Sequence, residues 1–523
     1  MSVPEKLDND VSEPIDSISK EDALSSSPKL DVEAHPGSEI NEKSLLRKLD
    51  LTLLPALTLL YLLSFLDRSN VANARIEGLT ADLHMTGDQY LTGLTLYFIG
   101  YVLFEIPSNI VLKRTTPRLW LPSLTLAWGV VSTLMGITQS LAGFLLVRFF
   151  LGVTESGLFP GVCFYLSMWY KRNEQQYRVA LFFSAASLAG AFGGILAWGI
   201  AHMKGVAGLN GWRWIFILEG ILTVLVSAIS YFFIVNYPAT AKFLSPDERT
   251  YVLNRLRDDS DATRDEAFAW TNVAAAFKDP KCWLYSLAFH TLSLPLYTLS
   301  LFLPTIIKAL HFSSARAQLL TVPPYALATT LTLLLAILSE RHRLRAFLII
   351  PSSLLAAIGY IILLSDPTPG VSYFGTILAA GGIYPATAIV LAWPANNVSG
   401  QTKRATANAM QISIGNLGAV LGTQLYRNED APRFFLGHGF ACGYLIANCI
   451  VVGTLWAVLG RENTKKERLL SSVAGAEERE DEREIKDDGK VDGNARDIAN
   501  TDNGAAVAEV WRGDEDWRWR FQR

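Results

Sequence analysis

The chain has 523 residues, of which 50% are hydrophobic and 18% are charged, and its mean hydropathy is +0.24. A water-soluble protein of this length carries more charge on its surface, so the composition excludes an ordinary soluble fold. The net charge of -3 and the lack of a basic stripe with interleaved aromatic residues argue against a nucleic-acid partner. Charges are concentrated in the first 48 residues, in 236–281 and beyond Arg461, which predicts an integral membrane protein.

The N-terminal segment has no sign of a secretory leader. Residues 1–44 are rich in Ser, Asp, Glu and Pro and contain no apolar core of the kind that a signal peptide needs. We therefore expect the first hydrophobic segment to act as its own insertion signal. Residues 1–48 contain little that could be buried, so we expect them to form a disordered tail.

Apolar stretches that are long enough to cross a bilayer recur along the chain. A spanning helix needs about 20 mostly apolar residues to cross roughly 30 Å of hydrocarbon. These stretches predict an all-α membrane protein with twelve transmembrane helices in two six-helix bundles, 49–235 and 283–460, joined by a linker at 236–282 and followed by a disordered tail at 461–523. The twelve segments are 49–74, 90–112, 119–138, 142–168, 178–202, 213–235, 283–307, 316–339, 344–364, 371–394, 404–426 and 436–459.

Positive charges mark alternate loops between these spans. Short loops that are rich in Lys and Arg remain in the cytoplasm. We therefore expect both termini and the linker to be cytoplasmic, and we expect the protein to be a multi-pass protein of the plasma membrane. The marked loops carry Lys113, Arg114 and Arg118, then Lys171, Arg172 and Arg178, then Arg341, Arg343 and Arg345, and then Lys403 and Arg404.

An internal repeat supports the division into halves. The segment Gly-Leu-Phe-Pro at 157–160 in the fourth span is similar to Gly-Ile-Tyr-Pro at 382–385 in the tenth. Two patterns of glycines four residues apart, 190/194 and 418/422, allow helices to approach closely, and we expect both to lie between the two halves.

Asp67 and Arg68 lie inside the membrane at the end of the first span. The apolar run 51–66 covers only about 24 Å at 1.5 Å per residue, so the helix must continue through these two residues to complete its span. A charge at the centre of a bilayer costs about 2.5 to 3.5 kcal/mol on insertion scales, so such residues are expected to be functional.

The fourth span carries a second acid and base, Arg148 and Glu155. They are seven residues apart, which puts them on one face of a helix at about 10 Å along the axis, too far apart for a direct salt bridge. Gly157, Pro160 and Gly161 follow and weaken the helix there. We expect both charged side chains to face a water-filled path.

These four residues suggest a proton-coupling mechanism. In this hypothesis Asp67 and Glu155 take up and release protons, while Arg68 and Arg148 alternate between these carboxylates and an anionic substrate. The alternative is a buried charge network that only fixes the packing of the helices.

The C-terminal half has no matching acid and base within its spans. Its candidate substrate-binding residues are polar or aromatic, and packing within the bundle is an alternative role for each of them. Glu105, in the second span, is instead interpreted as a residue that pairs near the cytoplasmic end of its helix. The candidates are His290, Tyr297, Tyr325, Tyr384, Trp393, Asn408, Gln411 and Asn416.

Enzymatic signatures are missing from the sequence. It contains no phosphate-binding loop, no cluster of metal ligands and no arrangement of a nucleophile with its base. The expected protein is therefore not an enzyme, and it needs neither a cofactor nor a metal.

Three motifs resemble those of the major facilitator superfamily, and within it the anion:cation symporters of the fungal allantoate-permease branch, which includes nicotinate permeases. They are LDRSNVANAR at 66–75, FEIPSN at 104–109 and RFFLGVTESG at 148–157, and the segments 241–245 and 396–407 are similar too. The resemblance covers about 50–460.

The resemblance implies proton-coupled uptake of a small organic anion, such as allantoate, nicotinate or a related vitamin. It also implies proton and substrate roles for the positions of Asp67, Arg68, Arg148 and Glu155. The expected partners are this anion, protons and the lipid bilayer, and the chain is expected to act as a monomer. Export of an anionic secondary metabolite, or nutrient sensing without transport, are the alternative functions.

Overall fold

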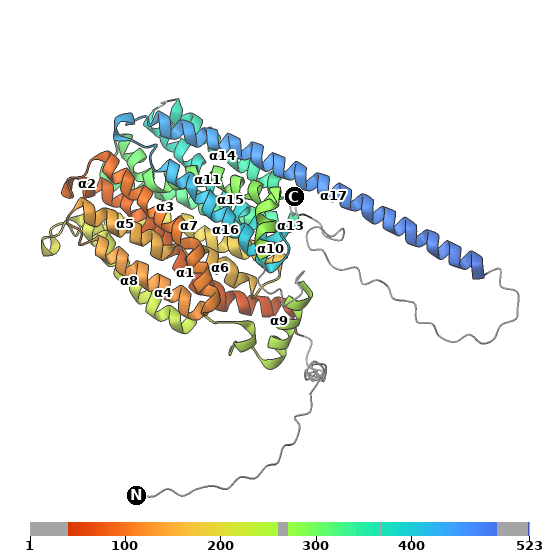
Figure 1. Cartoon of the computed structure of the whole chain (residues 1–523). Helices are drawn as coiled ribbons and strands as arrows, with labels where there is room; N and C mark the ends of the chain where they lie inside the picture. Colours follow the sequence, from red (N-terminus) through yellow and green to blue (C-terminus); the bar gives the residue numbers. More distant parts are fainter. Residues whose placement is uncertain (1–39, 260–269, 343, 366–367, 489–520, 522–523) are drawn as a thin grey trace, which may run out of the picture. The chain divides into compact units, whose positions relative to one another are not determined.

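The computed structural model describes residues 40–259, 270–342, 344–365, 368–488 and 521, and every regular element in these residues is helical. The helices belong to one compact unit, Glu42–Arg523. Figure 1 shows them in chain order by colour. The first half contains α1 (Glu42–Ile76), α2 (Leu79–Asp82), α3 (Gly87–Arg114), α4 (Pro117–Met135), α5 (Leu141–Glu155), α6 (Leu158–Ser167), α7 (Arg172–Ala201) and α8 (Gly211–Phe233).

The second half follows a linker that is itself partly helical. The linker contains α9 (Pro246–Asp259) and α10 (Trp270–Lys278). The second half then contains α11 (Pro280–Ala309), α12 (Ser314–Leu319), α13 (Val322–His342), α14 (Arg345–Leu364), α15 (Pro369–Asn397), α16 (Gln401–Gly422) and α17 (Phe435–Asp488).

The long helices follow the predicted spans. Within the described residues, ten helical segments are long and apolar enough to cross a membrane. The third and eleventh predicted spans correspond to α4 and α16, which are outside this set of ten but are 19 and 22 residues long. Each packs along a neighbour that does belong to the set, α4 against α8 and α16 against α11. The all-helical membrane fold predicted from the sequence is confirmed.

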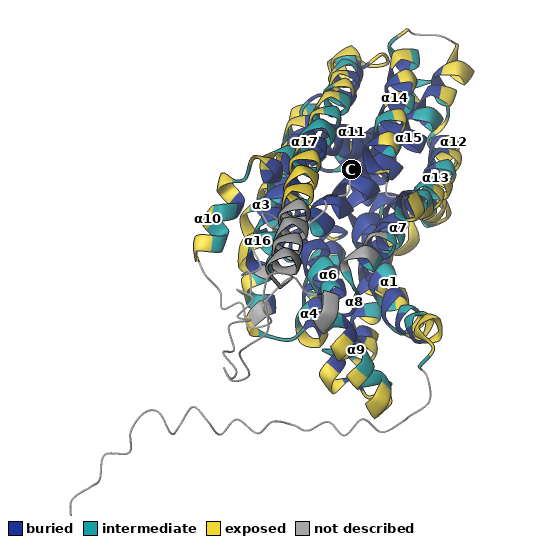
Figure 2. Ribbon diagram, turned by 90° about the vertical axis from the view of Figure 1, so that its right-hand side faces the viewer, coloured by how far each residue is buried: buried dark blue, intermediate teal, exposed yellow. Residues whose placement is uncertain are grey.

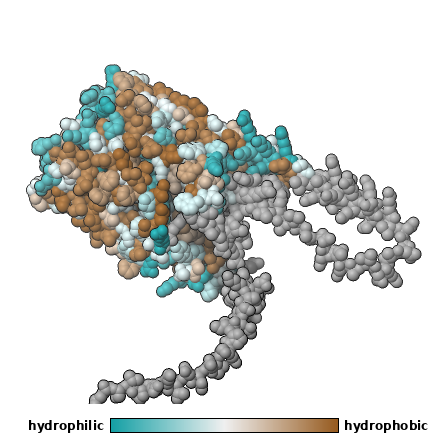
Figure 3. Space-filling view, viewed as in Figure 1, coloured by the Kyte–Doolittle hydropathy of each residue, from teal (hydrophilic) through white to brown (hydrophobic). Residues whose placement is uncertain are grey.

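Large apolar side chains cover the outer faces of the helices. Phe232, Ile450 and Leu103 are 81%, 66% and 60% exposed. Figure 3 shows apolar side chains gathered over the helices, and Figure 2 shows buried residues between helices with exposed ones on the outside. Such an extensive apolar surface is typical of helices that face lipid, because apolar side chains pay no hydrophobic penalty when they are exposed to hydrocarbon.

Close helix contacts in the first half depend on glycine. Gly152 of α5 lies directly against the backbone of α3, where an added Cβ would collide with the carbonyl oxygen of Tyr97. Gly100 of α3 lies in turn against the backbone carbonyl of Phe149, at 2.5 Å from the position of a Cβ. The two backbones therefore touch at the level of Tyr97 and Glu155.

The two glycine patterns have different partners. Gly190 of α7 lies against the ring of Tyr325 on α13, so the first pattern is at the contact between the halves, as predicted. Gly418 and Gly422 of α16 lie instead against α11 of their own half, next to His290 and Thr298. The expectation that the second pattern joins the halves is wrong, because spacing of small residues specifies a close approach and not the partner helix.

The fourth predicted span is divided into α5 and α6. The break falls at Ser156 and Gly157, and α6 begins at Leu158, just before Pro160. Gly157 has no room for a side chain because Ser108 of α3 occupies the space. The local weakening expected from this glycine and proline is therefore present, and it occurs immediately after Glu155.

The boundaries of the predicted tails differ from the structure. The first seven residues of α1, 42–48, are helical, and 1–39 lie outside the described residues. The helix α17 continues through the predicted tail from residue 461 as far as Asp488. Residues 461–488 contain no proline and one glycine and are rich in Glu, Lys, Arg and Ala, which have high helix propensity. This intrinsic helix propensity, which needs no buried apolar surface, accounts for the continued helix.

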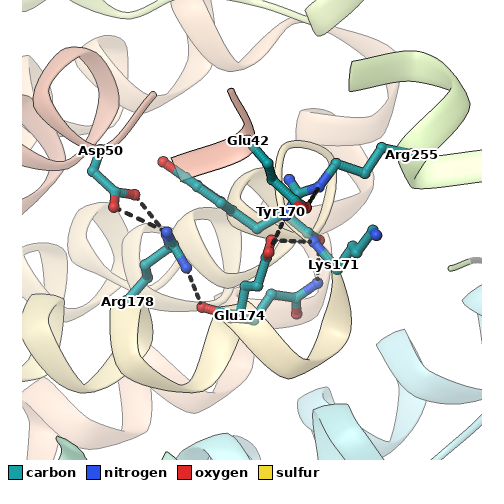
Figure 4. A network of polar contacts seen from close by, with 8 residues as sticks. Glu42, Asp50, Tyr170, Lys171, Glu174, Arg178 and Arg255 are labelled. Atoms are coloured by element: carbon teal, nitrogen blue, oxygen red, sulfur yellow. Dashed lines mark hydrogen bonds and ion pairs between the residues drawn. The ribbon is translucent and has the colours of Figure 1, made fainter. Parts of the chain in front are cut away.

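Ion pairs attach the linker to the first half (Figure 4). Arg178 of α7 donates two hydrogen bonds to Asp50 of α1, at 2.6 and 2.9 Å, and its guanidinium lies 4.1 Å from the centre of the Tyr170 ring. Arg255 of α9 donates to Glu42 of α1 at 2.8 Å and also to Glu174 of α7. These contacts mark the linker side of the molecule, where α1 and α7 begin.

We expect Gly152→Ala to destabilise the protein by about 1–3 kcal/mol, the usual effect of overpacking a close contact. The added methyl group would push α5 away from α3 at the carbonyl of Tyr97. Gly199→Ala on α7 is the matched control, because nothing lies within 4 Å of its Cβ position. Thermal unfolding of the purified variants in detergent measures the difference, and equal melting temperatures would contradict this description of the contact.

Candidate functional site

A small pocket lies between the two halves. Arg68 is the only charged residue that lines it, among the residues that the structure describes. The rest of the lining is aromatic, apart from two aliphatic side chains and one amide. The lining residues are Tyr61, Arg68, Tyr101, Phe159, Phe183, Phe289, Tyr297, Leu391, Ile412 and Asn416.

Arg68 forms a buried ion pair with Glu155. Its Nη2 lies 2.7 Å from Oε1 of the carboxylate, and the two side chains are 4% and 1% exposed. Tyr97 donates a hydrogen bond to Oε2 at 2.6 Å, and Ser64 donates one to Oε1. The carboxylate therefore has a charged partner and two hydroxyl partners, which offset the cost of removing both charges from water.

Four aromatic rings surround the guanidinium of Arg68. Its Cζ lies 5.3 Å from the ring centres of Phe65 and Tyr97 and 5.4 Å from those of Tyr101 and Tyr297. Such distances allow attraction between the cation and the electron-rich ring faces. Tyr297 belongs to α11, and its hydroxyl also accepts a hydrogen bond from Arg68 Nη1 at 2.9 Å. Arg68 thus connects the two halves through a single side chain.

Arg148 is buried without a counter-ion. Its exposed fraction is 0%, and within the described part of the chain none of its three guanidinium nitrogens has a hydrogen-bond partner. Its Cζ lies 5.0 Å from the centre of the Tyr97 ring. The guanidinium of Arg68 also lies near this ring, at 5.3 Å. A buried guanidinium without hydrogen-bond partners is costly, and Arg148 is not among the residues that line the pocket.

Asp67 lies away from this pocket, although it is adjacent to Arg68 in sequence. Its two carboxylate oxygens accept hydrogen bonds from Ser132 of α4 at 2.8 Å and from Thr223 of α8 at 3.1 Å. Successive residues on a helix point about 100° apart, so Asp67 faces the interior of the first half while Arg68 faces the second half. The structure therefore does not bring Asp67 together with either arginine.

Glu219 is a buried acid that the sequence analysis did not select. It lies on α8, is 3% exposed and accepts a hydrogen bond from Asn70 of α1. The rule that singled out Asp67, an ionisable residue inside an apolar span, applies equally to Glu219 within 213–235. Tyr97 and Tyr101, which contact Arg68, were also missed, because tyrosines are common in spans and carry no such signal.

The candidates from the second half are dispersed. Tyr297 lines the pocket. His290 contacts the carbonyl of Ile414 at 2.9 Å, and Gln411 donates to the carbonyl of Val390 at 2.9 Å, so both connect helices of the second half.

Four further candidates lie outside the pocket lining, namely Tyr325, Tyr384, Trp393 and Asn408. Tyr384 is fully buried, with its ring 6.4 Å from that of Phe183 of α7. Asn408 is partly buried on α16. Asn416, which was considered along with them, does line the pocket.

Contacts between the halves close the end of the molecule that is remote from the linker. Arg75 of α1 donates to Asn428 at 2.5 Å, and Lys308 and Ser314 donate to the carbonyl of Ile76 at 3.1 and 3.2 Å. The pocket instead extends from Arg68 toward the linker side, where Tyr61 lies about two turns earlier on α1.

Comparison with known proteins gives related sequences over most of the chain. The family model described as Major Facilitator Superfamily matches residues 57–423. The MFS-type transporter cnsO of Penicillium expansum is 38% identical over 443 residues, which are 82% of this chain and 86% of that protein. The high-affinity nicotinic acid transporter of Saccharomyces cerevisiae is 33% identical over 429 residues, 82% of this chain and 80% of that protein.

A solved structure has the same fold. A bacterial homolog of the human lysosomal transporter Spinster, in an inward-facing and unoccupied conformation, matches with a TM-score of 0.57 and 17% identity. The match covers 80% of this chain and 96% of the bacterial one.

We expect the Arg68–Glu155 pair to show strong thermodynamic coupling. Arg68→Ala and Glu155→Ala should each destabilise the protein by about 3–5 kcal/mol, because each leaves an uncompensated buried charge. The double variant should cost much less than the sum of the two, since it leaves neither charge behind. Thermal unfolding of the three variants tests this expectation, and additive losses would mean that the two side chains do not form a pair in the folded protein.

Proposed function

Because this chain belongs to the major facilitator superfamily, we propose that it is a secondary active transporter that takes up a small organic anion together with protons. The observation that carries this proposal is the buried Arg68–Glu155 pair at the wall of the pocket between the halves. The pair combines a group that can bind a proton with a cation that can bind an anion.

Protonation of Glu155 would free Arg68 for the substrate. While Glu155 is ionised, it occupies Arg68 at 2.7 Å and leaves no net charge in the pocket. A proton on Glu155 removes that attraction, so the guanidinium becomes available to a carboxylate, which it can bind with two parallel hydrogen bonds. Proton and anion then bind together, which is the requirement for symport.

The pocket favours a small, flat carboxylate. Phe159, Phe183 and Phe289 present aromatic surface, and Asn416 offers an amide near Arg68. Aromatic walls with a few polar groups bind planar ligands by stacking and fix their orientation by hydrogen bonds. An aromatic monocarboxylate such as nicotinate fits this description, and the similar protein of Saccharomyces cerevisiae is named as a nicotinic acid transporter.

The charge that crosses the membrane with the anion determines how many protons must accompany it. An inside-negative membrane potential opposes entry of a monoanion by about 2.3 kcal/mol per 100 mV. One proton cancels the charge and leaves the pH difference as the driving force, which is worth about 1.4 kcal/mol per unit. Uptake from an acidic exterior across the plasma membrane, with both termini in the cytoplasm, uses this force in the right direction.

A panel of labelled carboxylates tests the function directly. Cells that produce the protein should accumulate at least one of nicotinate, allantoate, pantothenate and biotin above control cells, and a protonophore should abolish the accumulation. Accumulation that survives the protonophore would contradict proton coupling, and efflux in place of uptake would favour an exporter.

We expect Glu155→Gln to separate binding from accumulation. In proteoliposomes with an inward gradient of about one pH unit, wild-type protein should concentrate nicotinate up to about tenfold for each coupled proton. The variant should concentrate nicotinate less than wild-type protein does, because a glutamine cannot carry a proton, yet it should still exchange internal for external nicotinate. A Glu155→Gln variant that concentrates nicotinate as strongly as wild-type protein would overturn the coupling role of Glu155.

We expect Arg148→Met to weaken anion binding without loss of stability. Hydrogen bonds to a charged group contribute about 1.5–3 kcal/mol, so loss of the guanidinium should raise the KM for nicotinate roughly 10- to 100-fold. The melting temperature should stay equal or rise, since the guanidinium has no partner to lose among the described residues. A lower melting temperature with an unchanged KM would assign Arg148 to packing.

A further inference from the structure

Glu105 is a buried acid at the contact between the two halves. It lies on α3, its exposed fraction is 0%, and its Oε2 accepts a hydrogen bond from the Ser413 hydroxyl of α16 at 3.1 Å. Within the described residues, its Oε1 has no hydrogen-bond partner. Glu105 therefore has a partner toward the end of its helix, as the sequence analysis expected, but this partner is a neutral hydroxyl from the other half.

Every cation on the helices packed against α3 is engaged elsewhere or distant. The helices in question are α4, α5, α6 and α16. Tyr101 on the same helix and Tyr297 on α11 are close enough to Glu105 to interact with it electrostatically. Among the cations of the packed helices, Arg118 donates to the Tyr231 carbonyl, Arg148 lies over the Tyr97 ring, Lys403 pairs with Asp279 and Arg404 donates to the Val398 carbonyl. The acid Glu155 binds Arg68. The two other titratable groups, Cys163 and Tyr165, are uncharged.

An ionised Glu105 would be an uncompensated charge in the membrane. A buried carboxylate with no cation and one hydrogen bond is far less stable than its neutral acid, which needs only ordinary hydrogen bonds. The side chain therefore holds a proton in this arrangement of the helices. Its environment contrasts with that of Glu155, which has an arginine and two hydroxyl partners.

We propose that Glu105 is a second proton-binding site, which loads a proton while α3 and α16 are packed together and releases it when they separate on the linker side. The proposal rests on the proton-coupled function given above and specifies its stoichiometry. Tyr101, one turn before Glu105, lines the pocket and brings the site close to it. Two protons then accompany each monoanion, so one net positive charge enters and the membrane potential assists uptake.

The location of Glu105 makes its proton sensitive to the movement of the halves. Separation of α3 from α16 removes Ser413 and admits water, which stabilises the carboxylate. Glu219 is a matched contrast, because it is also buried without a cation but connects α8 to α1 inside one half. Movement of the halves does not separate Glu219 from Asn70.

Charge displacement after a pH jump tests the site without any substrate. Proteoliposomes adsorbed on a solid-supported membrane report protons that move into the protein within the bilayer. Wild-type protein and Glu219→Gln should give similar displaced charge, and Glu105→Gln should give measurably less. Ser413→Ala keeps the acid and should change the pH midpoint of the displacement, so it provides a second test if Glu105→Gln is poorly folded.

Infrared difference spectra identify the group. The spectrum of wild-type protein should contain the C=O band of a protonated carboxyl that is missing from Glu105→Gln, and its amplitude should fall as the pH rises. An unchanged band in Glu105→Gln, equal displaced charge in Glu105→Gln and wild-type protein, or equal losses in Glu105→Gln and Glu219→Gln would overturn the proposal.

Measurements of nicotinate uptake distinguish the proposed role of Glu105 from the proposed transport function. Failure of the wild-type protein to accumulate any carboxylate would overturn the proposed function, whereas the substrate-free measurements would still decide whether Glu105 exchanges a proton. If uptake is observed, wild-type uptake should increase with an inside-negative potential, and Glu105→Gln should lose that response while it still responds to the pH gradient.

Discussion

The buried contact between Arg68 and Glu155 is the interaction on which the rest of the site depends. Removing two opposite charges from water is favourable only if they stay together and their remaining hydrogen-bonding capacity is filled. Tyr97 and Ser64 donate hydrogen bonds to the carboxylate, and the hydroxyl of Tyr297 accepts a hydrogen bond from the guanidinium. Because Tyr297 comes from the other half, any change in the charge of Glu155 also changes the force that holds the halves together.

The helix packing makes this contact possible. The backbones of α3 and α5 touch at Gly152, which brings Tyr97 within hydrogen-bonding distance of Glu155. The regular helix is interrupted at Ser156 and Gly157, directly after Glu155. Small residues therefore act here by positioning larger ones.

The sequence predicts the fold and the principal charges well, and it predicts their partners poorly. Length and hydropathy locate the spans because each helix must satisfy its own backbone in lipid. The cost of a charge in the membrane singled out Arg68, Arg148 and Glu155. Glu155 could pair with Arg148 on its own helix or with Arg68 on another. The choice depends on how the helices are rotated about their axes, which no local sequence pattern specifies. Asp67 shows the same limit, since it faces α4 and α8 although its neighbour faces the pocket.

The four buried acids of the first half, all within the described residues, differ in what surrounds them, and under the proposed mechanism this difference gives them different tasks. Glu155 has an arginine, Asp67 has two hydroxyl donors, Glu219 has an amide and Glu105 has a single hydroxyl from the opposite half. A carboxyl changes its protonation during a transport cycle only if its surroundings change with the cycle. The contacts of Asp67 and Glu219 lie within one half and move with it. The contacts of Glu155, through Arg68 and Tyr297, and of Glu105, through Ser413, cross between the halves, so these two acids are the ones that a relative movement of the halves can drive.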